Sequence, residues 1–207
     1  MRYAWVLIAS LIASPVMADD NAVVVHGGWQ HTSNSNYNDG ATGSIRYERR
    51  LLGDFWVAPD YTYHGDMLHH NGNDDAQFDY GDLSGHSLLG DLIWHPDIEV
   101  VGFSPYLIAG AGWSWWSFDV APDTEALGIE VEMGGTFAYK AGAGVNYNLG
   151  RGWYANLEWS FFKALVPYTA THPDGTPSYI LGDDRASGEV RVGEEESRLV
   201  LGVRKEF

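Results

Sequence analysis

The fold is decided by the C-terminal stretch Ser197-Arg198-Leu199-Val200-Leu201-Gly202-Val203-Arg204-Lys205-Glu206-Phe207. One parity of this stretch carries Leu199, Leu201, Val203 and Phe207, and the other carries Arg198, Arg204 and Glu206. Successive side chains of a strand point to opposite faces of the sheet. In a membrane barrel one face meets lipid and the other meets the lumen, with aromatic residues at both interfaces. The stretch therefore predicts the closing strand of a β-barrel in the bacterial outer membrane.

The N-terminal segment, residues 1–18, has the features of an export signal. Arg2 gives it a basic start, an apolar core runs from Ala4 to Ile12, and the small residues Val16 and Ala18 precede a cleavage site. The apolar core is shorter than the ~20 residues of a spanning helix. We predict a cleaved signal peptide at residues 1–18 and one outer-membrane β-barrel domain at residues 19–207.

The composition agrees with a barrel and excludes one class of partner. Aromatic residues reach 14%, there are 25 glycines, and no cysteine is present. Barrels use aromatic side chains at two membrane interfaces and small residues where strands bend. The formal net charge of −16 argues against nucleic acid as a partner, because phosphate binding needs clustered lysine and arginine.

Alternation of apolar and polar residues predicts eight strands. They lie near residues 22–31, 42–50, 55–64, 86–95, 104–118, 135–149, 153–163 and 197–207. Short connections (51–54, 96–103 and 150–152) alternate with long ones (32–41, 65–85, 119–134 and 164–196). This asymmetry is typical of short periplasmic turns and long extracellular loops. The prediction is an all-β protein, an eight-stranded antiparallel up-and-down transmembrane β-barrel; a soluble lipocalin-like barrel is the alternative fold.

Charged residues fall on the parity that faces inward. They are Arg46, Glu48, Asp60, Asp91, Lys140, Glu158, Arg198, Arg204 and Glu206. Buried charges persist only when they are paired and hydrogen-bonded. We expect a network of ion pairs that fills a narrow lumen, since eight strands leave little interior space. A polar passage or a binding cavity is the functional alternative.

Aromatic residues cluster toward the outer rim. The set is Trp113, Trp115, Trp116, Phe118, Phe137, Trp159, Phe161 and Phe162. Most of them are expected in the aromatic girdle of the membrane interface. We assign Trp113, Trp115 and Phe162 to the inward parity, where they are candidates to line an apolar site for a small hydrophobic solute.

Two segments contain histidines that are candidates for catalysis or metal binding. His31 and Ser33 could act as base and nucleophile in deacylation of lipid, but their surroundings have the composition of an ordinary polar loop. His69 and His70 lie near acidic residues without the spacing of a metal site. We expect no catalytic residue, no metal and no cofactor.

Three segments resemble the OmpW family of small outer-membrane barrels. They are Ser104-Pro105-Tyr106-Leu107-Ile108-Ala109-Gly110-Ala111-Gly112, Ala141-Gly142-Ala143-Gly144-Val145-Asn146-Tyr147 followed by Trp153-Tyr154-Ala155-Asn156, and the strand that ends at Phe207. The resemblance covers about residues 86–207. It implies an eight-stranded barrel that admits small hydrophobic molecules. The lumenal charges and the short segment before the first strand depart from that pattern.

The resulting functional prediction is a non-enzymatic outer-membrane barrel for membrane integrity and for binding or passage of small hydrophobic molecules. Its expected partners are outer-membrane lipid and lipopolysaccharide, and the expected state is a monomer. One alternative is a lipid A deacylase similar to the acyloxyacyl-hydrolase barrels, whose His-x-Ser-Asn motif lies late in the chain, where this chain has Trp159-Ser160-Phe161-Phe162. The other is a surface adhesin or receptor that acts through the acidic extracellular loops.

Overall fold

The structure is a computed structural model. It describes residues 20–31, 39–70, 79–126, 128–174, 176 and 187–207, without the side chains of 66–70, 79–80, 123–124 and 187–196. The predicted signal peptide lies outside the described residues, so its cleavage stays a prediction.

Nine strands and one short helix form the described part of the chain. In chain order they are β1 (Asn21–His31), β2 (Gly40–Leu52), β3 (Phe55–His70), β4 (Asp79–Trp94), β5 (Phe103–Val120), α2 (Pro122–Glu125), β6 (Glu130–Met133), β7 (Gly135–Gly150), β8 (Trp153–Thr171) and β9 (Ser187–Glu206). Among these residues no helix is long and apolar enough to cross a membrane.

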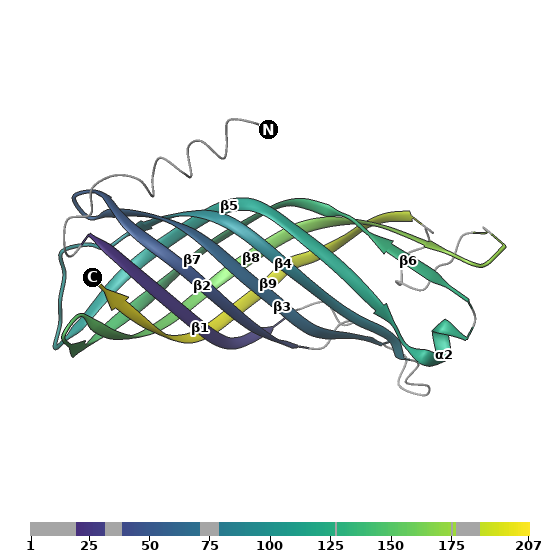
Figure 1. Cartoon of the computed structure of the whole chain (residues 1–207), viewed down its shortest axis with the longest axis horizontal. Helices are drawn as coiled ribbons and strands as arrows, with labels where there is room; N and C mark the ends of the chain where they lie inside the picture. Colours follow the sequence, from purple (N-terminus) through teal and green to yellow (C-terminus); the bar gives the residue numbers. More distant parts are fainter. Residues whose placement is uncertain (1–19, 32–38, 71–78, 127, 175, 177–186) are drawn as a thin grey trace.

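The strands close into one antiparallel ring. Each long strand pairs with the next along the chain, and β9 pairs with both β8 and β1. The short strand β6 pairs with the far end of β8, where it continues the line of β7 beyond Gly134. Eight positions around the ring are thus filled, as predicted. Figure 1 shows the strands slanting across the barrel, with the C terminus at one end and β6 and α2 at the other.

The wall has an apolar outward face and, at these positions, a polar inward face, as the alternation predicts. Along β8, for example, Leu157, Trp159 and Phe161 are exposed, whereas Asn156, Glu158 and Ser160 are buried. An uninterrupted belt of exposed aliphatic and aromatic side chains is stable only against lipid. The barrel is therefore a transmembrane barrel, and the lipocalin-like alternative is wrong.

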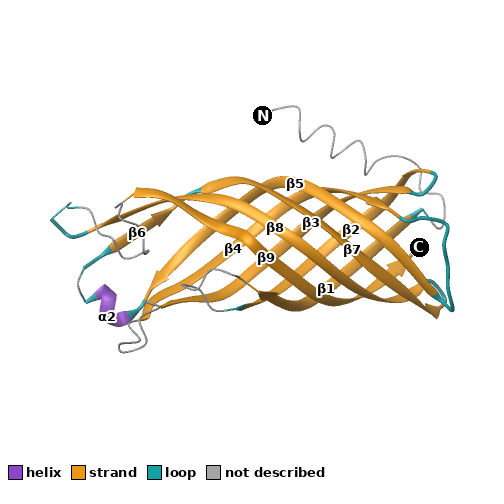
Figure 2. Cartoon of the chain, turned by 180° about the vertical axis from the view of Figure 1, so that it is seen from behind, coloured by secondary structure: helices purple, strands orange, loops and turns teal. Residues whose placement is uncertain are grey.

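The strands reach farther than the sequence predicts. β3 continues to His70 and β8 to Thr171, so the connections on that side are shorter than the predicted loops 65–85 and 164–196. Along the extension of β8 the inward positions are filled by Val166, Tyr168 and Ala170, so the inward face there is apolar and not polar. Figure 2 shows these extensions with β6 and α2 beside them.

Candidate functional site

An ion-pair network fills the periplasmic half of the lumen. Arg46 donates from Nη1 to Oε2 of Glu158 at 2.7 Å and from Nε to Oε1 of Glu48 at 3.0 Å. Arg204 donates from Nε to the other oxygen of Glu48 at 2.7 Å and from Nη1 to Glu206. Arg46, Glu48, Glu158 and Arg204 are buried. Each charge has an opposite partner, which is the condition under which charges tolerate burial.

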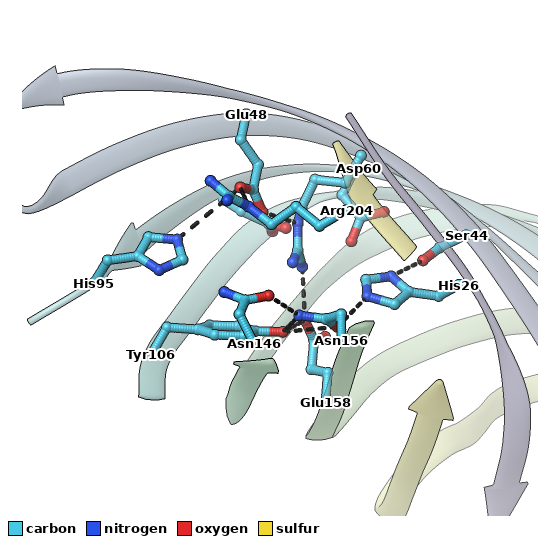
Figure 3. Close-up of polar contacts among 12 residues, drawn as sticks. His26, Ser44, Glu48, Asp60, His95, Tyr106, Asn146, Asn156, Glu158 and Arg204 are labelled. Carbon is cyan, nitrogen blue, oxygen red and sulfur yellow. Dashed lines mark hydrogen bonds and ion pairs between the residues drawn. The ribbon is translucent and has the colours of Figure 1, made fainter. Parts of the chain in front are cut away.

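Neutral side chains complete this network (Figure 3). Tyr106 donates its hydroxyl to Oε2 of Glu158 at 2.9 Å, and Asn156 donates from Nδ2 to Oδ1 of Asn146 at 2.7 Å. His26 Nε2 donates to Oδ1 of Asn156 at 2.6 Å, while Nδ1 lies 3.1 Å from the hydroxyl of Ser44. Tyr106 and His26 were not among the residues predicted from the sequence to form the site. Their inward parity was the available signal, because Tyr106 alternates with exposed Pro105 and Leu107.

A second group of charges lies at mid-height in the lumen. Lys140 bridges two carboxylates, Asp60 and Asp91, and its Nζ is 2.8 Å from Oδ2 of Asp91. The structure thus places Arg46, Glu48, Asp60, Asp91, Lys140, Glu158, Arg198 and Arg204 inside the barrel. Seven of the eight form ion pairs with described residues; Arg198 forms none with a described side chain.

The periplasmic mouth of the lumen contains a cavity of about 210 Å³, whose lining includes Trp56, His95 and Arg204. The guanidinium groups of Arg50 and Arg204 each lie 5.1 Å from the Trp56 ring. His95 packs against Trp56 and Tyr106, with Nε2 4.0 Å from Oε2 of Glu48. Burial, aided by Arg204 and opposed by Glu48, lowers the pKa of His95 to about 4. The imidazole is therefore neutral at neutral pH.

The extracellular half of the lumen is apolar. Its buried cluster consists of Leu83, Leu89, Trp116, Phe118, Ala138, Phe162, Ala164, Val166 and Tyr168. At the floor of this cluster the His64 ring lies 4.5 Å from that of Phe162 and 5.2 Å from that of Trp116. His64 donates from Nδ1 to Oε1 of Gln30 at 2.8 Å and accepts from Ser87 at Nε2. This apolar cluster therefore ends on a layer of polar side chains.

The structure corrects two of the three residues predicted to line an apolar lumenal site. Phe162 is 1% exposed and points inward, but Trp113 and Trp115 are each 47% exposed and face lipid. The inward parity of β5 instead carries Trp116 and Phe118. The prediction was wrong because this segment is aromatic on both faces, so hydrophobicity alone does not fix its parity. Extending the outward series Leu107, Ala109 and Ala111 by steps of two reaches Trp113 and Trp115.

One hydrogen bond bears on the hydrolase alternative. His31 donates from Nδ1 to Oδ1 of Asp39 at 2.7 Å, and Trp29 donates to the other oxygen at 3.2 Å. Both members of the His31–Asp39 pair are solvent-exposed, at 63% and 37% of their side chains. Ser33 lies outside the described residues, as do the side chains of His69 and His70. The pair by itself is an ordinary surface contact.

The lipid-facing wall carries a shallow hollow of about 800 Å³ over β3, β4 and β5. Small residues form its floor, where Pro59, Gly90 and Ala111 are register neighbours. This hollow belongs to the outer surface of the barrel and is separate from the apolar cluster inside it.

The chain is similar to known proteins in its fold. No protein-family model matches the chain, and no curated protein matches it. Among solved structures, OprG from Pseudomonas aeruginosa has a TM-score of 0.66 at 12% identity, covering 92% of this chain and 97% of that one. Neisserial surface protein A has a TM-score of 0.55 at 17% identity, covering 90% and 95%. The chain has the fold of the small outer-membrane β-barrels.

OmpW from E. coli shares this fold with a TM-score of 0.50 at 14% identity. The match covers 93% of this chain and 100% of that one. The resemblance to OmpW-type barrels that the sequence predicts is therefore confirmed for the fold. At these identities the likeness does not extend to a ligand or an activity.

Proposed function

We propose that this protein is a non-enzymatic outer-membrane barrel that binds small hydrophobic molecules in the extracellular half of its lumen. The cluster of inward apolar side chains that includes Trp116 and Phe162 carries the proposal. The lumen of a membrane barrel is ordinarily polar, because its outer face takes the apolar residues. An enclosed apolar cluster on the inner face therefore calls for an explanation beyond the alternation of the strands.

The lower lumen favours binding over passage. Ion pairs of Arg46, Glu48, Glu158 and Arg204 cross the interior on the periplasmic side of the apolar cluster. Opening a path through them would separate buried charges at a cost of several kcal/mol. The same network ties β2, β8 and β9 together, which supports the proposed contribution to membrane integrity. Contact with lipopolysaccharide and a monomeric state stay predictions.

Photolabelling of the protein in lipid nanodiscs tests this proposal. The protein is purified from outer membranes and exposed to a diazirine analogue of decanol, and labelled peptides are identified by mass spectrometry. We expect label on the inward residues of the apolar cluster, and we expect unlabelled decanol to reduce it. Phe162→Ala and Trp116→Ala should raise the competing concentration about tenfold, since each removes a large buried contact.

The neighbouring residues provide matched controls. Phe161 and Trp115 are adjacent in sequence to Phe162 and Trp116 but face lipid. Phe161→Ala and Trp115→Ala should leave lumenal labelling unchanged. Labelling confined to lipid-facing residues of the wild type, or lumenal labelling that is insensitive to Phe162→Ala and Trp116→Ala, would contradict the proposal.

A further inference from the structure

We propose that the hollow on the lipid-facing wall is a binding site for one phospholipid of the periplasmic leaflet. The hollow lies over β3, β4 and β5, and its lining includes Arg49 of β2. One acyl chain of the lipid fills the hollow, and its phosphate group pairs with the Arg49 guanidinium. This site is on the outer surface of the barrel, so it is independent of the inward apolar cluster.

The hollow arises because small residues occupy adjacent outward positions on three strands. Pro59, Gly90 and Ala111 are register neighbours on β3, β4 and β5. A Cβ atom added at Gly90 would meet only the carbonyl oxygen of Ala111 at 3.8 Å, so the space above the backbone is open. Leu88 and Leu92 flank Gly90 on the outward face of β4 and form walls of the hollow. Its volume of about 800 Å³ lies within the range of pockets that bind small ligands.

The hollow crosses the wall obliquely because the strands are tilted (Figure 1). At its β2 end, Arg49 pairs with Asn21, the first residue of β1, near the periplasmic rim. At its β5 end, Ala109 and Ala111 lie at mid-length of the strand Phe103–Val120. The hollow therefore runs from the periplasmic interface toward the interior of the bilayer. An acyl chain follows the same path from its head group.

Arg49 provides the charge that favours a phospholipid over an uncharged apolar molecule. Its side chain is half-buried and has the same outward parity as Ile45, which is exposed to lipid. A lipid-facing arginine is costly at the bilayer midplane and costs little near the interface, where phosphate groups lie. The planar guanidinium matches two phosphate oxygens, and its five N–H donors allow this contact beside those within the protein.

Tyr47 completes the head-group end of the hollow. It lies between Arg49 and Ile45 on the outward face of β2 and also lines the hollow. Its hydroxyl donates to Oδ1 of Asn21 at 2.8 Å, which fixes the ring at the periplasmic rim. Tyrosine rings favour this depth because one edge is apolar and the other polar. The guanidinium and the ring thus form a fixed polar end on an otherwise apolar hollow.

Native mass spectrometry of the protein released from lipid vesicles in mild detergent tests this site. The vesicles contain phosphatidylethanolamine, phosphatidylglycerol and diacylglycerol, whose masses identify the lipid that stays bound. We expect the wild type to retain one phospholipid. Arg49→Gln should raise the phospholipid concentration needed for half retention on the order of tenfold, because a charged hydrogen bond is lost. Gly90→Leu should abolish retention, since the new side chain occupies the hollow.

Two variants elsewhere on the outward face are matched controls. Lys205→Gln removes a cation at the periplasmic end of β9, whose Nζ lies 5.5 Å from the centre of the Trp153 ring. Ala155→Leu enlarges a small, exposed residue of β8. Both changes leave the hollow and Arg49 intact, so both variants should retain phospholipid as the wild type does.

The retained mass decides between the possible occupants. A wild type that retains no lipid, or retains diacylglycerol as readily as phospholipid, would overturn the proposal. Retention that neither Arg49→Gln nor Gly90→Leu changes would overturn it as well, and a dimer mass that Gly90→Leu abolishes would assign the hollow to a second copy of the chain. Heat-dependent electrophoretic mobility shows whether each variant has folded. If Gly90→Leu does not fold, Arg49→Gln and the preference for phospholipid over diacylglycerol still decide.

Discussion

Tyr106 on β5 lies directly over Gly144, its register partner on β7. A Cβ atom on Gly144 would overlap the phenol ring. The ring is held there because its hydroxyl donates to Glu158 at 2.9 Å and because Arg46 lies 5.8 Å from its centre. Because Gly144 has no side chain, the ring of Tyr106 on β5 can lie across β7. Its hydroxyl thereby reaches Glu158 on β8, two strands away.

Gly144→Ala should accordingly destabilise the barrel. We expect a loss of about 1–3 kcal/mol, the usual cost of inserting a methyl group into a packed interior. Urea unfolding in lipid vesicles, followed by tryptophan fluorescence, measures the effect. Gly90→Ala is the control, because a Cβ there meets only a carbonyl oxygen at 3.8 Å on the lipid-facing side. Equal stability of the two variants would show that Tyr106 moves aside freely.

Removing one member of the buried network should be more severe. Glu158→Gln removes the negative charge that lies 2.7 Å from Arg46 inside the barrel, although Glu48 remains. A loss of about 3 kcal/mol is expected. Asp20→Asn gives the contrast, since Asp20 and Arg50 are 3.5 Å apart and exposed, and such pairs contribute less than about 1 kcal/mol. The same unfolding measurement compares them, and similar losses for both variants would show that burial does not strengthen the Arg46–Glu158 pair.

Alternation of side chains made most of this fold predictable. Where one parity is polar, as with Arg198 and Arg204 on β9, the inward face follows directly from the sequence. The assignment failed on β5, where Trp113 and Trp116 are equally apolar but face opposite sides of the wall. The pairing of charges was also beyond the sequence, because the bond from Arg46 to Glu158 spans 112 positions and depends on how the ring closes.

The turn between β4 and β5 contains a residue poorly suited to its backbone. Val100 and Phe103 exchange two backbone hydrogen bonds of 2.9 and 3.0 Å around Val101 and Gly102. Val101 has φ = 53° and Gly102 has φ = 82°. Positive φ is unfavourable for a β-branched residue, and Asn-Gly is the preferred pair for such turns.

Val101→Asn should therefore stabilise the protein by about 1 kcal/mol. Val101 is 87% exposed, so the change removes no packing. Val100→Asn, one position earlier and without positive φ, should give no gain. The urea midpoints of the two variants test the turn. An unchanged or lowered midpoint for Val101→Asn would mean that the strain at this position is negligible.

His31→Ala should leave the acyl chains of lipid A unchanged. The His31–Asp39 pair is exposed at the barrel rim, and it forms no described contact with a hydroxyl nucleophile. Mass spectrometry of lipid A from cells that express wild type, His31→Ala or an empty vector provides the comparison. Loss of an acyl chain that depends on both the protein and His31 would establish the hydrolase alternative instead.

Stability should fall between neutral and mildly acidic pH because of His95. Its ordinary pKa of 6.5 is lowered to about 4 in the folded protein, so the unfolded chain binds a proton first as the pH falls. The contribution is fully present above about pH 6.5 and is lost progressively toward pH 4, by about 2.5 kcal/mol at pH 4.5. Unfolding in vesicles from pH 7.5 to 4.5 should therefore show a steeper decline for the wild type than for His95→Gln. Equal slopes for the wild type and His95→Gln would assign the pH dependence to other groups.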